Sequence, residues 1–247
     1  MRYFIELAYN GKNYHGWQIQ DNAHSVQEEL QNRMKILLKD DYELVGCGRT
    51  DTGVHASQFF AHFDIEQQLS NTERFVYQLN ALLPDDISIY KVFEVEPDLH
   101  ARFSAMEREY EYLISTRPTP FLNELSWTWF RVPDIEKMNE AAALLLTHSD
   151  FECFSKVHTQ VNTFICEVRK AEWKWKEEGL LSFTISADRF LRNMVRAIVG
   201  TLMEVGQGKM DLADFKKVLE SKNRSAAGQS VPARGLYLRR ISYPGIR

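Results

Sequence analysis

The sequence predicts an α+β fold in which helices pack over a mostly antiparallel sheet. Short segments rich in aromatic and β-branched residues, such as 3–9 and 87–95, are typical of strands. Apolar residues recur at helical spacing behind two serine capping boxes, which begin at Ser25 and Ser70. Two further strand-like segments are separated only by a short turn at 177–179, which is typical of a hairpin.

The first half contains, in order, a strand, a helix, a strand, a helix and two more strands. Ser25 with Glu28 is expected to cap the first helix, and Ser70 with Glu73 the second one. The expected strands are 3–9, 56–65, 87–95 and 110–114, and apolar residues mark the helices from Val26 to Leu37 and from Phe75 to Leu83.

The second half repeats this order in coarse outline. We place the boundary at the Arg117-Pro118-Thr119-Pro120 stretch, which divides the chain into halves spanning 1–116 and 117–247. The repeat indicates two similar α/β halves that share a central sheet flanked by helices. The expected ranges are a helix at 135–146, hairpin strands at 168–176 and 180–186, helices at 190–205 and 211–220, and a last strand at 236–241.

The composition is that of an ordinary globular protein. Of the 247 residues, 44% are hydrophobic and 26% are charged, and the formal net charge is −4. An acidic average argues against a surface that binds nucleic acid everywhere, because phosphates need basic side chains at the point of contact. An RNA-binding function therefore requires arginines gathered in one place.

Three features point to a soluble protein in a reducing cytoplasm. The N-terminal residues lack the basic start, apolar stretch and cleavage site of a secretory signal. The longest apolar run, 141–146, is far too short to cross a bilayer. Cys47, Cys153 and Cys166 are few, odd in number and widely spaced, which suggests neither a disulfide framework nor a metal knuckle. We expect no membrane partner and no metal ion.

The most unusual stretch of the chain is a glycine-rich loop at 46–56. Three glycines within eight residues allow the backbone to turn tightly and to come close to a ligand. Between them lie Arg49 and Asp51, a cation and a carboxylate two residues apart. On composition alone this pattern fits equally well a polar loop with a surface ion pair, which contributes only about 0–1 kcal/mol.

Asp51-Thr52-Gly53 also matches the D-T-G triplet of aspartic proteases. That chemistry requires two carboxylates about 3 Å apart that share one proton, whereas a nearby arginine would hold both ionised. Arg49 and Thr50 stand where proteases have apolar residues, and the chain contains no second triplet, so that a homodimer would have to supply it. We disfavour this interpretation, since a three-residue motif is weak.

The whole loop, Gly48-Arg49-Thr50-Asp51-x-Gly53-Val54-His55-Ala56, closely resembles the catalytic motif of the tRNA pseudouridine synthase A family. Other segments resemble further motifs of that family, in the right order and over almost the full chain. They are Tyr9-Asn10-Gly11-x-x-Tyr14-x-Gly16-Trp17-Gln18-x-Gln20, Ser25-Val26-Gln27-Glu28, His100-Ala101-Arg102-Phe103-Ser104-Ala105, Arg108-x-Tyr110-x-Tyr112, Phe190-x-x-x-Met194-Val195-Arg196-x-Ile198-Val199-Gly200-Thr201-Leu202 and Ala233-Arg234-Gly235-Leu236-Tyr237-Leu238.

The resemblance implies an isomerase that converts uridine to pseudouridine in the anticodon stem-loop of tRNA, at nucleotide positions 38, 39 and 40. It implies that Asp51 is the catalytic carboxylate, that Arg196 pairs with it, and that Arg49 assists in opening the RNA stack. The catalytic cleft is expected between the halves. The resemblance further implies a homodimer that binds RNA across a basic cleft, and we expect no cofactor.

The chemistry explains why a carboxylate is needed. The ribose carbon that loses its base resembles the oxocarbenium centre of glycoside cleavage, whose usual partner is a carboxylate. Asp51 would act there as a nucleophile or as a stabiliser of a transient sugar species. To do either it must be ionised, which requires a cationic neighbour.

Three arginines point to a basic face independently of the resemblance. On one helix, Arg189, Arg192 and Arg196 would fall within a narrow arc, roughly opposite the apolar residues. Such a face can bind phosphates despite the acidic average. Taken alone, the pattern fits the solvated side of an amphipathic helix somewhat better, and the motif match favours phosphate binding.

A stacked uridine must be flipped out before its ribose carbon and C5 can react. The resemblance points to Tyr110 as the aromatic platform for the extruded base, whereas we assign Tyr112 to packing. Arg102 and Arg108 are expected to contact RNA or to cap the central motif. For His55 we expect a structural hydrogen bond.

Two positions depart from the family pattern. Thr52 stands where alanine is more usual, and the segment 161–166 lies where many members carry a basic residue, so RNA contacts there are expected to be weaker. The competing hypothesis from another class is a non-catalytic RNA-binding module that uses the same sheet and arginines.

Overall fold

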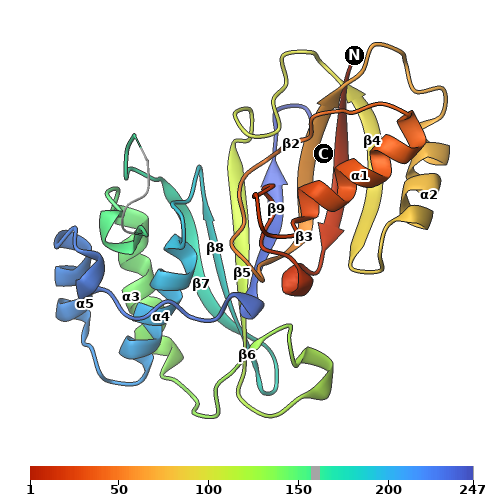
Figure 1. Cartoon of the computed structure of the whole chain (residues 1–247). Coiled ribbons are helices and arrows are strands. Elements are labelled where there is room, and N and C mark those ends of the chain that lie inside the picture. The colour runs from red at the N-terminus through yellow and green to blue at the C-terminus, as the bar shows by residue number, and fades with distance from the viewer. Residues whose placement is uncertain (157–161, 247) are drawn as a thin grey trace. The chain divides into compact units, whose positions relative to one another are not determined.

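The computed structural model describes residues 1–156 and 162–246, which form two compact units (Figure 1). The first unit comprises Met1–Met106 together with Tyr237–Arg247, and the second comprises Glu107–Leu236. These units are defined only by contacts within the chain. The division into functional halves at 1–116 and 117–247 therefore remains a prediction.

The first unit is built on a sheet whose C-terminal strand comes from the far end of the chain. The strands stand in the order β4-β1-β3-β9, and β2 pairs with β3. β1 is antiparallel to both β3 and β4, whereas β3 and β9 are parallel, with His55 opposite Tyr237. The strands are β1 Arg2–Tyr9, β2 Val45–Gly46, β3 His55–Asp64, β4 Ile87–Val95 and β9 Leu236–Ser242.

Aromatic side chains fill both faces of this sheet. On one face Trp17 stacks on Phe59, with ring centroids 4.1 Å apart. On the other face Phe4 packs against Phe60 and against the edge of Tyr243. The residues of β3 from Phe59 to Phe63 are all buried, because side chains cover both faces of the strand.

Two capped helices, α1 Val26–Leu38 and α2 Thr72–Leu82, belong to the first unit (Figure 1). The Ser25 hydroxyl accepts a hydrogen bond from the Glu28 N–H at 3.3 Å, as the capping box predicted. The expected second cap at Ser70 was wrong by one residue. Asn71 caps α2, and its side-chain oxygen accepts from the Arg74 N–H at 2.7 Å.

The second unit contains the antiparallel strands β5-β8-β7, in that order, with the short strand β6 parallel to β5. The hairpin between β7 and β8 turns at Gly179, whose φ of +82° favours glycine. The strands are β5 Glu107–Ser115, β6 Trp127–Thr128, β7 Val168–Glu177 and β8 Leu180–Ala187.

Three helices complete this unit, namely α3 Ile135–Leu144, α4 Met194–Gly206 and α5 Leu212–Glu220 (Figure 1). α3 is joined to β7 through Asn139, whose side chain donates to the Trp173 carbonyl and accepts from its N–H, at 3.1 and 2.8 Å. Short 3-10 turns occur in both units, at Gly11–Asn13, Pro120–Leu122, Leu145–Thr147, Glu152–Phe154, Arg224–Ala226 and Ala233–Gly235.

The start of α4 corrects the sequence analysis. The helix was expected from about residue 190, but it begins at Met194, because Asn193 has the left-handed φ of +66° that α-helices exclude. Arg189 and Arg192 therefore precede the helix, and only Arg196 lies on it. The helical arc that was expected to gather the three arginines does not exist.

The predicted class is confirmed as α+β with mostly antiparallel strands and five α-helices in the described residues. Across residues 1–156 and 162–246, no helix combines the length and the apolar character needed to cross a membrane.

The cap of α2 can be tested with neighbouring substitutions. Asn71→Ala should lower the free energy of unfolding by about 1 kcal/mol, because the Arg74 N–H loses its acceptor. Ser70→Ala, one residue earlier, should change it by less than about 0.5 kcal/mol. Urea denaturation of both variants measures this difference, and a larger loss for Ser70→Ala would contradict the assignment.

Candidate active site

The Asp51 loop connects β2 to β3 within the first unit. Asp51 is half-buried, whereas Arg49 and Thr52 are exposed. Directly after Asp51 the chain turns back, since the Val54 N–H donates to the Asp51 carbonyl at 3.1 Å and Gly53 has a φ of +76°. The glycine-dependent turn that the sequence predicted is thus present at Gly53.

Thr50 attaches the loop to the N-terminal segment. Its hydroxyl shares a hydrogen bond of 2.9 Å with the Tyr9 hydroxyl and accepts from the Trp17 N–H at 3.1 Å. A third bond joins the Gly53 N–H to the Tyr14 carbonyl at 3.2 Å. The residues on either side of Asp51 are therefore bonded to segment 9–17.

Two glycines of that segment allow this close approach. A Cβ atom on Gly11 would collide with the Val54 carbonyl, and one on Gly16 would collide with the Thr50 carbonyl. Gly16 also has a φ of +88°, which side chains rarely adopt. Sequence reasoning missed the roles of Thr50 and Gly16. The family motifs could have revealed them, because Thr50 lies in the motif of the Asp51 loop and Gly16 lies in the N-terminal motif.

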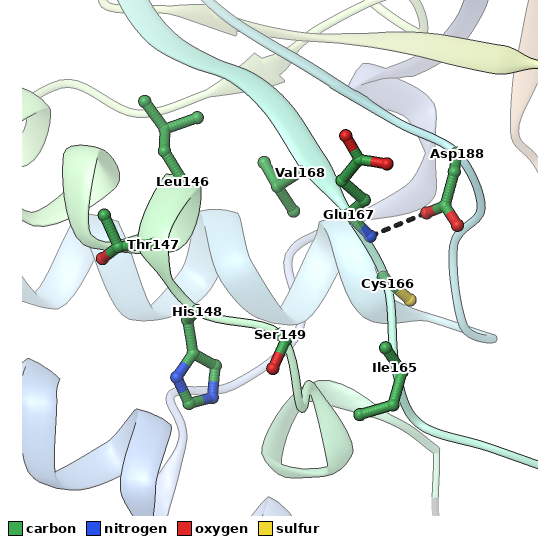
Figure 2. Close-up of a pocket in the computed structure, with 9 residues that line it drawn as sticks. All are labelled: Leu146, Thr147, His148, Ser149, Ile165, Cys166, Glu167, Val168 and Asp188. Atoms are coloured by element: carbon green, nitrogen blue, oxygen red, sulfur yellow. Dashed lines mark hydrogen bonds between the residues drawn. The ribbon is translucent and has the colours of Figure 1, made fainter.

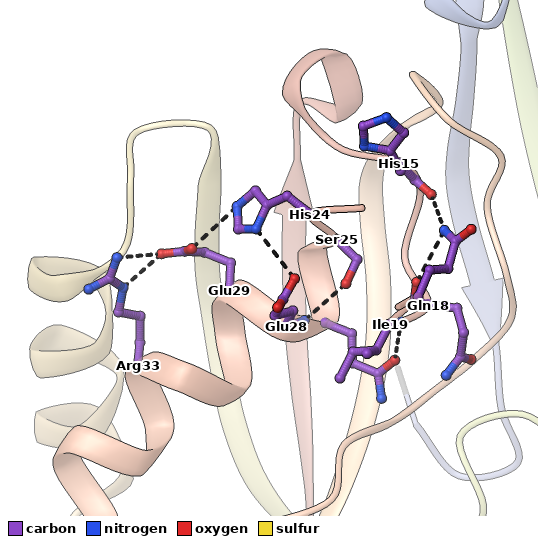
Figure 3. A network of polar contacts seen from close by, with 10 residues as sticks. His15, Gln18, Ile19, His24, Ser25, Glu28, Glu29 and Arg33 are labelled. Carbon is purple, nitrogen blue, oxygen red and sulfur yellow. Dashed lines mark hydrogen bonds and ion pairs between the residues drawn. The ribbon is translucent and has the colours of Figure 1, made fainter. Parts of the chain in front are cut away.

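The N-terminal segment is in turn anchored on the first turn of α1 (Figure 3). The Val26 and Gln27 N–H groups donate to the carbonyls of Gly16 and Trp17, at 3.2 and 3.0 Å. Near them, His24 lies between Glu28 and Glu29 at 3.5 and 3.4 Å, and Glu29 also pairs with Arg33. Two layers of hydrogen bonds therefore connect the Asp51 loop to a helix.

His55 has a structural role, as predicted. It is buried, and its Nδ1 atom accepts a hydrogen bond from the Gly11 N–H at 3.1 Å. Its ring stacks on Tyr237 with centroids 4.7 Å apart. The histidine thereby joins the end of the Asp51 loop to the N-terminal segment and to β9.

In the second unit, Tyr110 is half-buried on β5, and its ring meets the edge of Phe190 at 5.1 Å. Tyr112 has the packing role that was predicted. It is buried, its hydroxyl donates to the Pro232 carbonyl at 2.8 Å, and burial raises the pKa of its hydroxyl.

Arg196 is half-buried on the first turns of α4 and is oriented by the segment beside it. Its Nε donates to the Val231 carbonyl at 2.7 Å, and the Val231 N–H donates to the Arg196 carbonyl at 3.2 Å. Next to Val231, the Ser230 hydroxyl accepts from Asn193 Nδ2 at 2.6 Å and from Arg224 at 2.9 Å. Gly200 allows the same segment to lie against the helix, because a Cβ there would collide with the Gln229 carbonyl.

Of the other predicted arginines, Arg102, Arg189 and Arg192 lie on irregular backbone, whereas Arg108 lies on β5. Arg192 is exposed and Arg189 is half-buried, both in the stretch that leads to α4. Arg108 donates to the Asp188 carbonyl at 2.9 Å, within the second unit. Arg102 belongs to the first unit, where it is exposed on the turn before β5. Thus Asp51, Arg49 and Arg102 lie in the first unit, and Tyr110, Arg189, Arg192 and Arg196 lie in the second.

A shallow hollow of about 460 Å³ lies elsewhere in the second unit (Figure 2). Among the described residues it is lined by side chains such as His148, Cys166 and Asp188, and not by those predicted to be catalytic. Of the departing segment 161–166, residue 161 lies outside the described part of the chain, and Cys166 is buried. Within residues 1–156 and 162–246, no three side chains of His, Cys, Asp or Glu come together as metal ligands.

Comparison with known proteins identifies the family. A family profile described as tRNA pseudouridine synthase matches residues 141–244. The chain is 52% identical to tRNA pseudouridine synthase A of Bacteroides fragilis over 243 residues, which cover 98% of this chain and 96% of the relative. It is 48% identical to the protein of that name from Porphyromonas gingivalis, and 38% identical to the one from Bacillus pumilus, with 98% of this chain covered in each case. The chain belongs to the tRNA pseudouridine synthase A family.

Membership in the tRNA pseudouridine synthase A family confirms the resemblance and replaces the aspartic-protease interpretation of Asp51-Thr52-Gly53. In this member of the family, segment 9–17 holds the Asp51 loop in place. Any catalytic role of the Asp51 carboxylate depends on this local structure.

The close approach at Gly16 is testable. Gly16→Ala should lower the free energy of unfolding by more than about 1–2 kcal/mol, because alanine disfavours the positive φ and its methyl group displaces the Thr50 carbonyl. Gly48→Ala is the matched control in the Asp51 loop, since a methyl group there would meet nothing within 4 Å, and its unfolding free energy should stay within about 0.5 kcal/mol of wild type. Chemical denaturation measures both values, and equal losses would contradict the close-packing argument.

Proposed function

We propose that this chain isomerises uridine to pseudouridine in tRNA, at nucleotides 38, 39 and 40 of the anticodon stem-loop, with Asp51 as the nucleophile. The observation that carries the proposal is the attachment of the Asp51 loop to segment 9–17, in a chain that is 52% identical to a tRNA pseudouridine synthase A. Such attachment holds a carboxylate in one geometry, which is what catalysis of a sugar reaction requires.

The reaction exchanges one bond for another without a co-reactant. The bond between uracil N1 and ribose C1′ breaks, the base turns, and a new bond forms between C5 and C1′. The proton on C5 leaves, and N1 receives a proton, so the product has the mass of the substrate. Asp51 would attack C1′ as the base departs, and it would leave again when C5 attacks.

Two arginines would assist Asp51. Arg196 would hold the carboxylate ionised, and its bond to the Val231 carbonyl supports this role by restricting the plane of the guanidinium. Arg49, which is exposed beside Asp51 in the sequence, would take the place of the extruded nucleotide in the RNA stack.

Tyr110 would hold the extruded uracil. Its edge contact with Phe190 supports this role, because it limits the motion of the ring on β5. A base stacked on an aromatic ring gains about 1–3 kcal/mol, which offsets part of the unstacking cost.

RNA binding by an acidic chain would depend on local arginines. Arg189, Arg192 and Arg102 are the proposed phosphate contacts, and they act in a catalytic cleft between the two halves. We further propose that the protein is cytoplasmic, uses no cofactor and forms a homodimer. The second subunit would add another basic surface and so enlarge the area that contacts a folded RNA.

Asp51→Asn tests the nucleophile. This change keeps the shape of the side chain but removes its charge, so pseudouridine formation should fall to background while tRNA binding changes less than about threefold. Carbodiimide labelling followed by primer extension detects the product, and filter binding measures affinity. Asp85→Asn, an exposed carboxylate of the same unit, is the control and should retain activity.

Two results would contradict the proposal. If Asp51→Asn makes pseudouridine at the wild-type rate, the carboxylate is not catalytic. If wild-type protein binds tRNA but labels no uridine, the non-catalytic RNA-binding module is the better description.

The two arginines near the start of α4 should differ in their effects. Arg196→Ala should lower kcat about 100-fold or more, because a charge-stabilising group is lost. Arg192→Ala, which removes an exposed side chain ahead of the helix, should mainly raise KM for tRNA by a few-fold. Steady-state kinetics separates the two, and equal changes in kcat would show that Arg196 is an ordinary phosphate contact.

A further inference from the structure

The motif at 100–105 contains an exposed aromatic residue that the proposed reaction does not use. Phe103 is 76% exposed on the turn before β5. Its ring lies 4.4 Å from the His100 ring, and the Arg102 guanidinium lies over it at 5.5 Å from the centroid. Isolated apolar residues are common on surfaces, but here a stack of rings and a guanidinium surround the exposed one.

The stack continues into the core of the first unit. His100 meets His62 edge to face at 4.7 Å, and His62 stacks on the buried Phe4 at 6.1 Å. Four rings therefore lead from the core to the surface, and the Arg102 guanidinium covers the last one. A planar cation on an aromatic ring is a surface on which a further flat, π-rich group can stack.

Hydrogen bonds hold the turn in this shape. His100 Nδ1 accepts from the N–H groups of both Arg102 and Phe103, at 3.0 and 3.2 Å. His62 Nδ1 accepts from the Ala101 N–H at 3.2 Å, and the Tyr243 hydroxyl donates to the Ala101 carbonyl. The exposed ring is thus held by a rigid turn, which lowers the entropy lost when a partner binds.

The charges around the turn favour neutral histidines. Burial, Arg2 and His100 lower the pKa of His62 to about 4, and burial, Arg2 and Arg102 lower the pKa of His100. Both rings therefore stay neutral near pH 7 and keep Nδ1 as an acceptor for the N–H groups of the turn.

We propose that Arg102 and Phe103 form a second RNA contact, at which an unpaired nucleobase of the tRNA stacks on the guanidinium and ring while the arginine approaches the adjoining phosphate. This inference rests on the proposed tRNA substrate. The exposed ring and guanidinium favour RNA as the partner, because proteins recognise single-stranded bases by stacking them on aromatic and arginine planes. On β3, His62 lies seven residues after His55, the residue at the end of the Asp51 loop, which is a separation of roughly 23 Å at ~3.3 Å per residue. The stack therefore contacts a nucleotide other than the one that reacts.

The test compares two exposed phenylalanines. Phe103→Ala should weaken binding of an unmodified tRNA transcript about 5- to 100-fold and raise KM, while kcat at saturating tRNA stays within about twofold. Phe103→Tyr should restore binding, because it keeps the ring. Phe121→Ala is the matched control, since Phe121 is 87% exposed but no ring or cation contact with it is found among the described residues, and it should bind as wild type.

Salt dependence separates stacking from charge. Phe103→Ala removes no phosphate contact, so the slope of log Kd against log salt should stay unchanged. Arg102→Lys keeps the charge but loses the planar group, so it should weaken binding with the same slope. Light scattering of each variant reports the oligomeric state.

Two outcomes would overturn the proposal. Wild-type affinity for Phe103→Ala would show that the ring does not contact RNA. A change in molar mass for this variant would instead assign the stack to contacts between copies of the chain. The binding measurement does not depend on catalysis. If the wild-type protein makes no pseudouridine but Phe103→Ala still loses affinity for tRNA, the proposed function is refuted and the RNA contact stands.

Discussion

The position of Asp51 depends on how closely two segments, far apart in the sequence, approach each other. Segment 9–17 brings Gly11 and Gly16 against the carbonyls of Val54 and Thr50, and only the lack of a Cβ atom allows this distance. The Thr50 hydroxyl then completes the contact, with Tyr9 and Trp17 as its partners. The contribution of these contacts is geometric, because they restrict the backbone on either side of Asp51.

The same principle holds in the second unit. Arg196 owes its orientation to segment 224–231, which lies along α4 because Gly200 has no side chain and because the Thr201 hydroxyl accepts from the Gly228 N–H at 2.9 Å. Arg224 donates to the carbonyls of Ala227 and Gly228 and to Ser230, which keeps that segment in one shape. The guanidinium of Arg196, the proposed catalytic cation, is therefore oriented by neutral backbone groups, which cost little to bury when they are paired.

A net charge of −4 is compatible with an RNA substrate, because phosphate binding depends on the charge at the point of contact and not on the average over the chain. The guanidinium of Arg102 is oriented by the Phe103 ring, and that of Arg196 by the Val231 carbonyl. An ordered arginine loses less entropy on binding than a mobile one, so few of them suffice.

Prediction from sequence succeeded where the signal is local. Aromatic and β-branched residues located β4 with the observed bounds, and the serine capping box located the start of α1, because both signals depend on neighbours along the chain. Prediction failed at α4, where a regular periodicity suggested a helix from residue 190. The left-handed Asn193 is held by its bond to Ser230, a residue 37 positions away, and no local pattern reveals it.

The sequence by itself determined the α+β class, the family and the motif that contains Asp51, since these follow from periodicity and from the order of residues. The tertiary structure alone decided which groups hold the Asp51 loop and where the arginines lie. It also decided that Phe103 stands exposed at the end of a stack of rings that leads into the core. These features arise from contacts between distant segments, whose geometry is fixed only when backbone carbonyls, glycines and rings are packed together.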